Sequence, residues 1–342
     1  MARKPNTSSI TIRDVARQAG VSVATVSRYI NETARVSEPV GERIEEVLNR
    51  LQYRPHAAAR QLATQKMLAI GLLLNSIYND FFGPLLYGIE ELVQQNGYNL
   101  LVATSRPERR KENYPALGPH NVDGLLVFAD SLTDKELAGL HAQKLPMVLI
   151  HRSSPEGLDI PCVTVENKAA TFHLIEHLIK QHGRKSIVFM RGKVDQEDSY
   201  WREIGYREAL EANGLEFDPE LMLPGDFQRD VAYLSMRDFL SRPKRRQIDA
   251  VFTGDDSAAI GVMEALEQSG LRVPQDVSVV GFNDSRHSAF LNPPLTTINA
   301  PTHEVGRIAT KNLFNQITNH PVDSVTLLPT EIIIRQSCGC TS

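Results

Sequence analysis

The chain has few cysteines and no long apolar segment. Only three cysteines occur among 342 residues, which excludes a framework held together by disulfides. No apolar run approaches the roughly 20 residues that a membrane-spanning helix needs. The polar N-terminal sequence MARKPNTSSITIRD lacks the hydrophobic core of a secretory signal. We therefore expect a cytoplasmic protein, and neither a secreted nor a membrane protein.

The sequence patterns of common enzymes are also missing. There is no glycine-rich phosphate-binding loop, no Gly-x-Ser-x-Gly sequence, and no His/Cys spacing typical of a metal site. Asp255 and Asp256 could suggest acid–base catalysis, but neighbouring residues at a helix start point in different directions. We expect no catalysis and no cofactor, although turnover of a sugar would restore the enzyme hypothesis.

The C-terminal tail contains two of the cysteines, Cys338 and Cys340. Their thiols could join one metal ion or form a disulfide, but no third metal ligand is evident in the sequence. Chain ends are usually poorly ordered, so we expect this tail to be disordered.

Positive charge gathers near the N-terminus. Residues 1–66 contain eleven Lys and Arg and six Asp and Glu, a net charge of +5, whereas the remaining 26 basic and 35 acidic residues give −9. Chance variation of surface charge is one explanation. A small basic head on a larger acidic body also suits a polyanionic partner that contacts only the head.

Residues 11–31, TIRDVARQAGVSVATVSRYIN, predict two short helices joined by a tight turn. Thr11 and Asp14 have the spacing of a capping box. Gly20 can adopt the left-handed conformation that ends a helix, and Ser22 can cap the second helix. This pattern is typical of a helix-turn-helix.

The outer face of the second helix is unusual for a solvated surface. Val23, Ala24 and Arg28 lie together on it, although a valine beside an arginine does little for solubility. In the major groove, an apolar side chain can contact a thymine methyl and an arginine can bind guanine through two hydrogen bonds. An ordinary helical hairpin is the alternative. Further candidates for DNA contact, each of which could equally be a cap or merely exposed, are Thr11, Ser22, Thr25, Ser27, Asn31, Ser37 and Tyr53.

A third helix is predicted from Ser37, with Pro39 in the first turn, where its missing N–H loses no hydrogen bond. Three helices would complete an all-α headpiece over residues 1–53. The following hinge, residues 54–66, favours helix but is too short to be stable alone, so we expect it to fold when two copies meet on DNA. Leu62 either wedges between base pairs in the minor groove or packs on the neighbouring domain.

The sequences DVARQAGVS, TVSRYIN and VSE resemble the headpiece of the lactose/galactose repressor (LacI/GalR) family of bacterial regulators. The family also shares the hinge pattern Y-x-P-N-x-x-A-x-x-L. In this chain His56 stands at the position of the asparagine. The matching hinge positions are Tyr53, Pro55, Ala59 and Leu62. The resemblance implies that Leu62 opens the central step of an operator. Val23 and Ala24, at the positions that would contact bases, resemble those of the galactose-type regulators. This resemblance implies an operator with GTAA-like half-sites and a central CG step.

From residue 67 onward, apolar runs alternate with amphipathic stretches. Buried strands are predicted at 69–74, 98–104, 123–129 and 146–150, with helices at 84–96 and 133–143. A second series of strands is predicted at 162–165, 185–190, 249–253 and 277–281, with helices starting near 167, 199, 229 and 256. The repetition predicts an α/β body of two doubly wound parallel sheets, which resembles periplasmic binding proteins.

The resemblance also implies how the chain divides between the two lobes. It places a last helix, about 302–318, on the first lobe and the strands near 325–328 and 331–335 on the second. The first lobe would then contain about 67–161 and 290–320, and the second about 162–289 and 321–337. The chain would cross between the lobes three times.

Ligands of open parallel sheets bind beyond the carboxyl ends of the strands. Aromatic rings there can pack on the apolar faces of a sugar, while Arg, Asp and Asn bind its hydroxyls. The segment SYWREIGY matches the family pattern S-x-x-R-x-x-G-(Y/F) and implies that Arg202 binds the effector. The other effector candidates that the strand ends and the resemblance indicate are Phe81, Phe82, His151, Arg152, Phe227, Asp255 and Asn283.

We interpret Asp255 as a ligand contact and Asp256 as the cap of its helix. Asn283 stands at a usual aspartate of the family, which removes a charged acceptor and adds two donors. His151 also stands where an aspartate is common, which weakens the assignment of a sugar at that position.

The whole pattern predicts a homodimeric transcription regulator, in the first place a repressor, whose DNA affinity a small ligand controls. Its headpieces would lie one helical turn apart on a pseudopalindromic operator. The alternative is a solute-binding module with the same body and no DNA function, which the basic head and the absent signal sequence disfavour. The residues leave open which ligand binds and whether it weakens or strengthens DNA binding.

Overall fold

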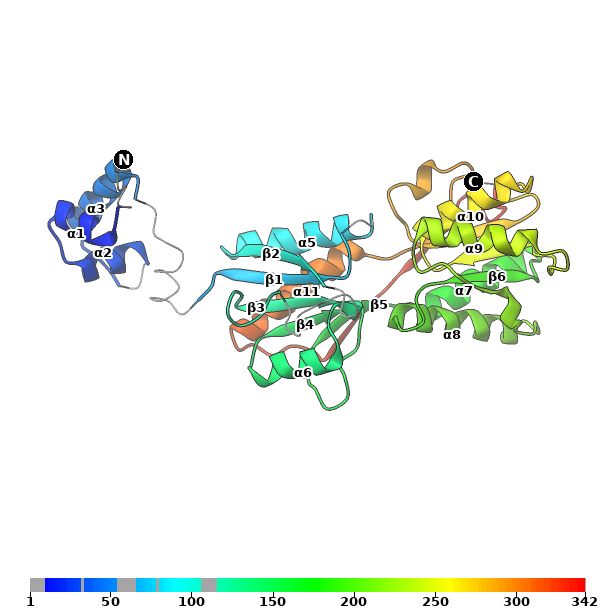
Figure 1. The fold of residues 1–342 in the computed structure, drawn as a ribbon, viewed down its shortest axis with the longest axis horizontal. Helices are drawn as coiled ribbons and strands as arrows, with labels where there is room; N and C mark the ends of the chain where they lie inside the picture. The colour runs from blue at the N-terminus through cyan, green and yellow to red at the C-terminus, as the bar shows by residue number, and fades with distance from the viewer. Residues whose placement is uncertain (1–9, 32–33, 54–65, 78–79, 106–115, 342) are drawn as a thin grey trace, which may run out of the picture. The chain divides into compact units, whose positions relative to one another are not determined.

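The computed structural model describes residues 10–31, 34–53, 66–77, 80–105 and 116–341. The chain folds into two compact units, residues 1–67 and 68–342 (Figure 1). Within the described ranges, no helix is both long and apolar enough to cross a membrane. The predicted hinge helix, including Ala59 and Leu62, lies outside the described residues.

The first unit contains three helices, α1 (Ile12–Ala19), α2 (Val23–Ile30) and α3 (Glu38–Leu51). The predicted capping box is confirmed, because the N–H of Thr11 donates to Oδ2 of Asp14 at 3.0 Å. Gly20 ends α1 with φ of +65°. The side chain of Ser22 caps α2 by accepting from the backbone N–H of Thr25 at 3.1 Å. Local sequence therefore sets both ends of the helix-turn-helix.

A small apolar core joins these helices. Its buried members are Val15, Ala16, Ala19, Val26, Ile44 and Val47. Gly41, which weakens helix propensity, lies in α3 against the ring of Tyr29, and an added Cβ would approach that ring to 3.0 Å. The close contact between α2 and α3 explains why a glycine stands inside a helix.

The first lobe of the second unit is built on a six-stranded parallel sheet in the order β11-β5-β4-β3-β1-β2. Its helices lie on the sheet faces, and α11 packs on α5, β3 and β4. Strands β1 and β3 are buried along their whole length. The prediction of a buried strand at 98–104 is wrong, because β2 is an edge strand and stays largely exposed. The elements are β1 (Ala69–Leu74), α5 (Phe82–Gln95), β2 (Asn99–Thr104), β3 (Gly124–Phe128), α6 (Asp134–Ala142), β4 (Met147–Ile150), β5 (Cys162–Val165), α11 (Thr302–Ile317) and β11 (Val325–Leu328).

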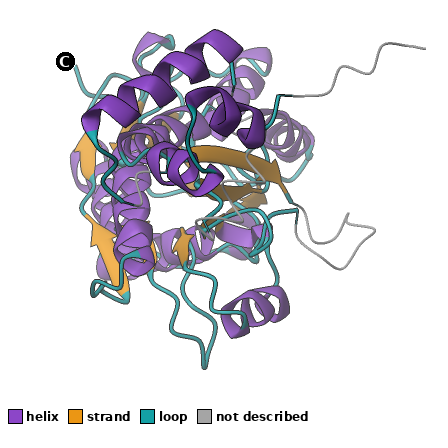
Figure 2. Cartoon of the chain, turned by 90° about the vertical axis from the view of Figure 1, so that its left-hand side faces the viewer, coloured by secondary structure: helices purple, strands orange, loops and turns teal. Residues whose placement is uncertain are grey.

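The second lobe has a sheet in the order β12-β10-β9-β8-β6-β7, parallel except for the antiparallel β12. Helices and strands alternate along both lobes, as the predicted α/β class requires; Figure 2 distinguishes them by colour. The elements are α7 (Lys168–His182), β6 (Ile187–Arg191), α8 (Glu197–Ala212), β7 (Met222–Pro224), α9 (Arg229–Ser241), β8 (Ala250–Thr253), α10 (Asp256–Gln268), β9 (Ser278–Asn283), β10 (Thr296–Asn299) and β12 (Glu331–Ile333).

The predicted division between the lobes is wrong at three strands, β5, β10 and β11. β5 was assigned to the second lobe, but it pairs with β4 and β11 in the first sheet. β11 was also assigned to the second lobe but lies in the first sheet. β10 falls in the segment 290–320 that was assigned to the first lobe, but it pairs with β9 in the second sheet. The three crossings therefore follow β5, β10 and β11. A short apolar run predicts a strand, but its sheet is decided by pairing with residues far away in the sequence.

Candidate functional site

The outer face of α2 presents the predicted reading residues. Ala24 and Arg28 are exposed, and Val23 keeps 41% of its surface exposed. Among the described residues, Arg28 has no hydrogen-bond or ion-pair partner, whereas Arg17 of α1 pairs with Asp14 at 2.8 Å. An exposed valine next to an uncompensated arginine is suited to base edges in a groove.

The predicted phosphate contacts surround this face, and several of them also hold the helices. Oγ of Ser22 lies 2.8 Å from Oγ1 of Thr25, and the amide of Asn31 donates to Oγ of Ser27 at 3.3 Å. The hydroxyl of Thr11 donates to Asp14 at 2.7 Å, and these bonds lower the pKa of the Asp14 carboxyl. Ser37 is exposed, and Tyr53 is half-buried.

A cavity of about 630 Å³ lies in the second unit, lined by both lobes. Its walls come from the segments that follow the carboxyl ends of β1, β3, β4, β6, β8 and β9, the expected place for a ligand. The structure brings seven of the eight predicted effector residues to this interlobe cleft. They are Phe81, Phe82, His151, Arg202, Phe227, Asp255 and Asn283.

Arg152 is the exception, and its prediction as an effector contact is not supported by the structure. Its guanidinium donates to the backbone oxygens of Ala129 and Leu132 and pairs with Asp134. These partners all belong to the first lobe. Arg152 lines not this cavity but an adjacent pocket, to which Asp195 and Glu197 of the second lobe also contribute. A residue that directly follows a strand can turn to either side, and here the neighbouring carbonyl groups decide the direction.

Aromatic rings form the wall of the first lobe. The ring of Phe81 contacts Phe82, Phe128 and His151, with centroids 5.5, 5.8 and 5.6 Å apart. His151 also meets the edge of Phe128 at 5.6 Å. Phe128 was not predicted, although it ends the apolar run of β3. This wall can pack against an apolar face of a ligand.

Phe227 supplies the opposite wall from the second lobe. Its backbone φ of +57° is rare for a bulky residue. The ring lies directly over Gly192, where any Cβ would overlap it. The conformation is therefore fixed by the backbone beneath the ring, which leaves the ring in the interlobe cleft.

Arg202 is held at the base of the cleft by α8. Its Nε donates to Oδ1 of Asn167 at 2.8 Å, and another guanidinium nitrogen donates to the backbone oxygen of Gly254. The guanidinium carbon lies 3.6 Å from the ring centroid of Phe282. The side chain keeps only 3% of its surface exposed. The arginine is thus positioned before any ligand arrives.

Asp198 is a central residue that the sequence analysis missed. Its carboxylate lies 3.6 Å from Arg202, 3.0 Å from Nδ1 of His151 across the interlobe cleft, and 2.9 Å from Nδ2 of Asn167. Burial alone would raise its pKa, but His151, Arg202 and Asn167 outweigh burial and lower it. The spacing of four residues before an arginine on a helix was the available signal.

The roles predicted for two aspartates are corrected by the structure. Asp255 caps α10, because its Oδ1 accepts from the N–H of Ala258 at 2.8 Å, and it also lines the cleft. Asp256 accepts from Thr297 at 2.6 Å and from the hydroxyl of Ser288 at 2.7 Å. Burial raises the pKa of Asp256 to about 7, although its hydrogen bonds act in the other direction. Asp256 therefore connects α10 with β10 and with the segment around Ser288.

Two buried polar atoms at the cleft have no hydrogen-bond partner among the described residues, Nε2 of His151 and Oδ1 of Asn283. Such atoms are rare in folded proteins unless a ligand or water satisfies them. Both residues, like Phe227, also have positive φ, +57° for His151 and +105° for Asn283. Strained backbone concentrates at binding sites, so the interlobe cleft has the features of a ligand site.

Comparison with known families agrees with this geometry. Residues 11–56 match the model described as bacterial regulatory proteins, lacI family, and residues 175–338 match a periplasmic binding protein-like domain. The chain is 32% identical to catabolite control protein A of Priestia megaterium, over 96% of this chain and 99% of the relative. It is 33% identical to the ribose operon repressor of Escherichia coli K12, over 95% and 98%.

Solved structures show the same architecture. The lac repressor dimer bound to operator and the anti-inducer ONPF aligns with a TM-score of 0.82 and 26% identity, over 96% of this chain and 99% of that chain. The complex of the transcriptional regulator CelR with cellobiose aligns with a TM-score of 0.70 and 28% identity, with the same coverage. The alignments thus cover both the helix-turn-helix headpiece and the two-lobed body, over nearly the whole length of these relatives. The chain belongs to the lacI family of bacterial regulatory proteins and is a DNA-binding transcriptional regulator.

Proposed function

We propose that this regulator is a cytoplasmic repressor that binds a pseudopalindromic operator as a homodimer. A small sugar, bound in the interlobe cleft, controls its affinity for the operator. The relatives are named as regulators, and the proposal includes no catalytic step.

The interlobe cleft carries the proposal for the ligand. Two opposed aromatic walls, Phe81 and Phe227, enclose a space that also contains the unsatisfied atoms of His151 and Asn283. Rings pack on the C–H faces of a sugar, and donors and acceptors at the rim bind its hydroxyls. This combination favours a polyol over a purely apolar ligand.

The charges of the cleft favour a neutral ligand over a phosphorylated one. Its lining has more acids than bases, so an anion would meet net negative charge. The acids are Asp80, Asp198, Asp226, Asp230 and Asp255, and the bases are Lys193, Arg202 and Arg229. Two of the compared proteins carry sugar names, a ribose operon repressor and a regulator solved with cellobiose. Another relative is named HTH-type transcriptional repressor PurR, of Aliivibrio fischeri.

Polar contacts across the cleft give the ligand a way to act on the lobes. Besides the pair of His151 with Asp198, Nζ of Lys193 lies 3.5 Å from Asp130. Ser153 of the first lobe donates through its N–H to Glu197 at 2.6 Å. A ligand that rearranges these contacts shifts the balance between two lobe arrangements, and such coupling is typically worth about 1–3 kcal/mol.

In the headpiece, Val23, Ala24 and Arg28 are proposed to read bases, with a GTAA-like half-site and a central CG step. Their exposure on one face of α2 supports this assignment. Selection of binders from random duplexes tests it. Recovery of a palindrome with this half-site is the expected result, and a selection that returns no palindrome would contradict it.

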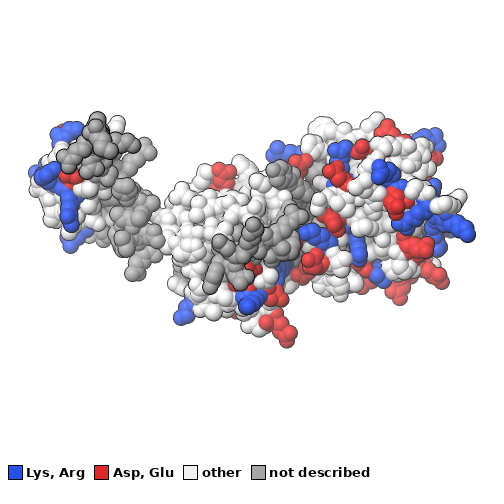
Figure 3. Space-filling view, in the orientation of Figure 1, with Lys and Arg blue, Asp and Glu red and all other residues white. Residues whose placement is uncertain are grey.

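For the dimer, we propose the face of β2 and α5. β2 is an edge strand on which Leu101 and Val102 are 38% and 42% exposed, and Tyr87 of α5 is 65% exposed. Figure 3 shows few charged side chains on this part of the first lobe, whereas the second lobe carries many. Exposed apolar patches beside an open sheet edge are typical of interfaces.

Thermal unfolding against neutral sugars, sugar phosphates and purines tests the ligand class. A ligand present at 100 times its Kd stabilises the state it binds by about 2.7 kcal/mol. The proposal is supported if one neutral sugar raises the unfolding temperature and Phe227→Ala abolishes this increase. Arg237→Ala, in the same lobe but outside the cleft, is the control and should keep the increase. A shift by a purine or a phosphate alone contradicts the sugar assignment. A ligand shift in a chain that selects no DNA would favour the solute-binding alternative.

A further inference from the structure

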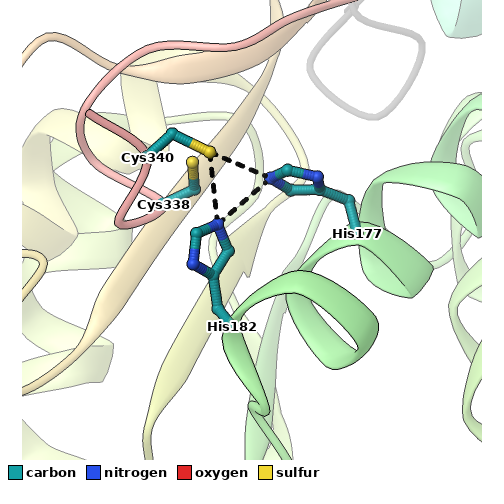
Figure 4. Close-up of side chains that lie close together, drawn as sticks. All are labelled: His177, His182, Cys338 and Cys340. Atoms are coloured by element: carbon teal, nitrogen blue, oxygen red, sulfur yellow. Dashed lines mark hydrogen bonds between the residues drawn. The ribbon is translucent and has the colours of Figure 1, made fainter. Parts of the chain in front are cut away.

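Four side chains from distant parts of the chain meet on the second lobe, away from the cleft. They are His177 and His182 of α7 and Cys338 and Cys340 of the C-terminal tail (Figure 4). Each offers one ligand atom, and these four atoms all lie within 4.8 Å of one another. The structure thus places the described part of the tail against α7, and the prediction of a disordered end is wrong.

Hydrogen bonds hold the tail in this position. Oγ of Ser337 donates to the backbone oxygen of Val279 at 2.6 Å and accepts from the N–H of Thr296 at 2.8 Å. Oγ of Ser278 donates to the backbone oxygen of Cys338 at 2.7 Å. The tail is thus attached to the second sheet just before its two cysteines, and Cys338 is fully buried.

Between the cysteines, Gly339 allows the chain to reach the histidines. Its φ is +113°, a conformation that side chains rarely adopt. An added Cβ would also come to 3.0 Å from Nδ1 of His182. The glycine therefore serves both the turn between the thiols and the close approach of an imidazole.

The distances agree with tetrahedral coordination. A tetrahedral ion with Zn–N of about 2.0 Å and Zn–S of about 2.3 Å requires N···N of about 3.3 Å and N···S of about 3.5 Å. Nε2 of His177 and Nε2 of His182 are 3.3 Å apart. Sγ of Cys340 lies 3.7 Å from the first nitrogen and 3.4 Å from the second. Sγ of Cys338 now lies 3.3 Å from the backbone oxygen of Arg335, so it would turn toward the ion.

We propose that His177, His182, Cys338 and Cys340 form a site for a divalent zinc ion. Two thiolates and two neutral imidazoles balance the charge of Zn²⁺, which suits a partly buried position. Four protein ligands leave no open coordination position, so the ion is structural and not catalytic. It fastens the C-terminal tail to α7.

The site is separate from the proposed ligand cleft. α7 begins next to Asn167, which binds Arg202 in the cleft wall, and ends at His182. Fifteen helical residues span about 22 Å. The zinc ion is therefore too far from the cleft to contact an effector.

Metal analysis of the full-length protein tests the proposal. The protein is purified without an affinity tag that binds metals, under reducing conditions, and its zinc content is measured after dialysis. The expected result is one zinc ion per chain. Replacement by Co²⁺ should produce the d–d bands of a tetrahedral ion and a thiolate-to-cobalt charge-transfer band.

Matched variants identify the ligands. Cys340→Ser and His177→Gln should weaken Co²⁺ binding by more than the roughly 10–100-fold that changes beside a metal site produce. His173→Gln on the same helix and Cys162→Ala in the first lobe should bind as the unchanged chain does. Cys340 is half-exposed near the chain end, so its variant keeps the test valid even if His177→Gln fails to fold.

Other outcomes would overturn the proposal. A reduced protein that contains no zinc and gives no charge-transfer band with Co²⁺ has no such site. Metal that both variants retain is bound elsewhere. Loss of two titratable thiols on mild oxidation, in a reduced protein that binds no metal, would identify Cys338 and Cys340 as a redox pair instead.

Discussion

The buried pair of Asp198 and Arg202 allows a direct measurement of how far the cleft is organised before a ligand binds. Their charged groups are 3.6 Å apart, and the side chains are 16% and 3% exposed. Breaking a buried pair by removing one partner typically costs about 3–5 kcal/mol. Asp198 would keep His151 and Asn167 as partners. We therefore expect Arg202→Leu to lower the free energy of unfolding by about 2–3 kcal/mol.

A double-mutant cycle separates the pair from other effects of each substitution. Urea unfolding is measured for the unchanged chain, Asp198→Asn, Arg202→Leu and the double variant, and we expect a coupling energy of about 1–2 kcal/mol. Glu203 and Arg207 provide the control, because they have the same i,i+4 spacing on α8 but are more exposed. Their coupling should be about 0.3–0.5 kcal/mol. Equal coupling in the two cycles would refute the view that buried charge organises the cleft.

Three further predictions concern other parts of the chain. Burial raises the pKa of Asp256 to about 7, so the folded state favours its protonated form. The free energy of unfolding of the unchanged chain should therefore exceed that of Asp256→Asn most below about pH 4. This difference should fall by at most about 4 kcal/mol as the pH rises to 7. Urea unfolding at several pH values checks this, and a difference that stays constant with pH would contradict it. Arg28→Ala should weaken binding to the selected duplex by about 1–3 kcal/mol and relax its preference at one base pair. Arg17→Ala removes a positive charge of the headpiece outside α2, so its effect on affinity should be the same for all sequences; fluorescence anisotropy distinguishes the two. Val102→Arg should shift sedimentation from dimer toward monomer, while Leu327→Arg on the other edge of the same sheet should not, and a dimer that survives Val102→Arg would exclude the proposed face.

Local features were predictable because their causes lie within a few residues. The capping box of Thr11 and Asp14 and the cap at Ser22 need only neighbours three positions away. Buried strands likewise show as apolar runs, and the residues that follow them line the cleft as the parallel topology requires. The headpiece, the fold class and most of the candidate site belong to this group.

Features that depend on distant partners were not predictable in the same way. Nothing in residues 162–165 shows that β5 pairs with β11, some 160 residues later. The two histidines and two cysteines meet only because the tail is fixed to the second sheet. The direction of Arg152 and the capping role of Asp255 depend on which carbonyl or amide group lies nearest in space.

The last two strands have a consequence for how the body is made. β11 completes the first sheet and β12 completes the second, and only two residues separate them. During synthesis, therefore, neither sheet can acquire its final edge until residues 325–333 have left the ribosome. A chain cut short before residue 325 would leave β5 and β10 open along one side at once. One segment of nine residues, 325–333, thus completes both lobes.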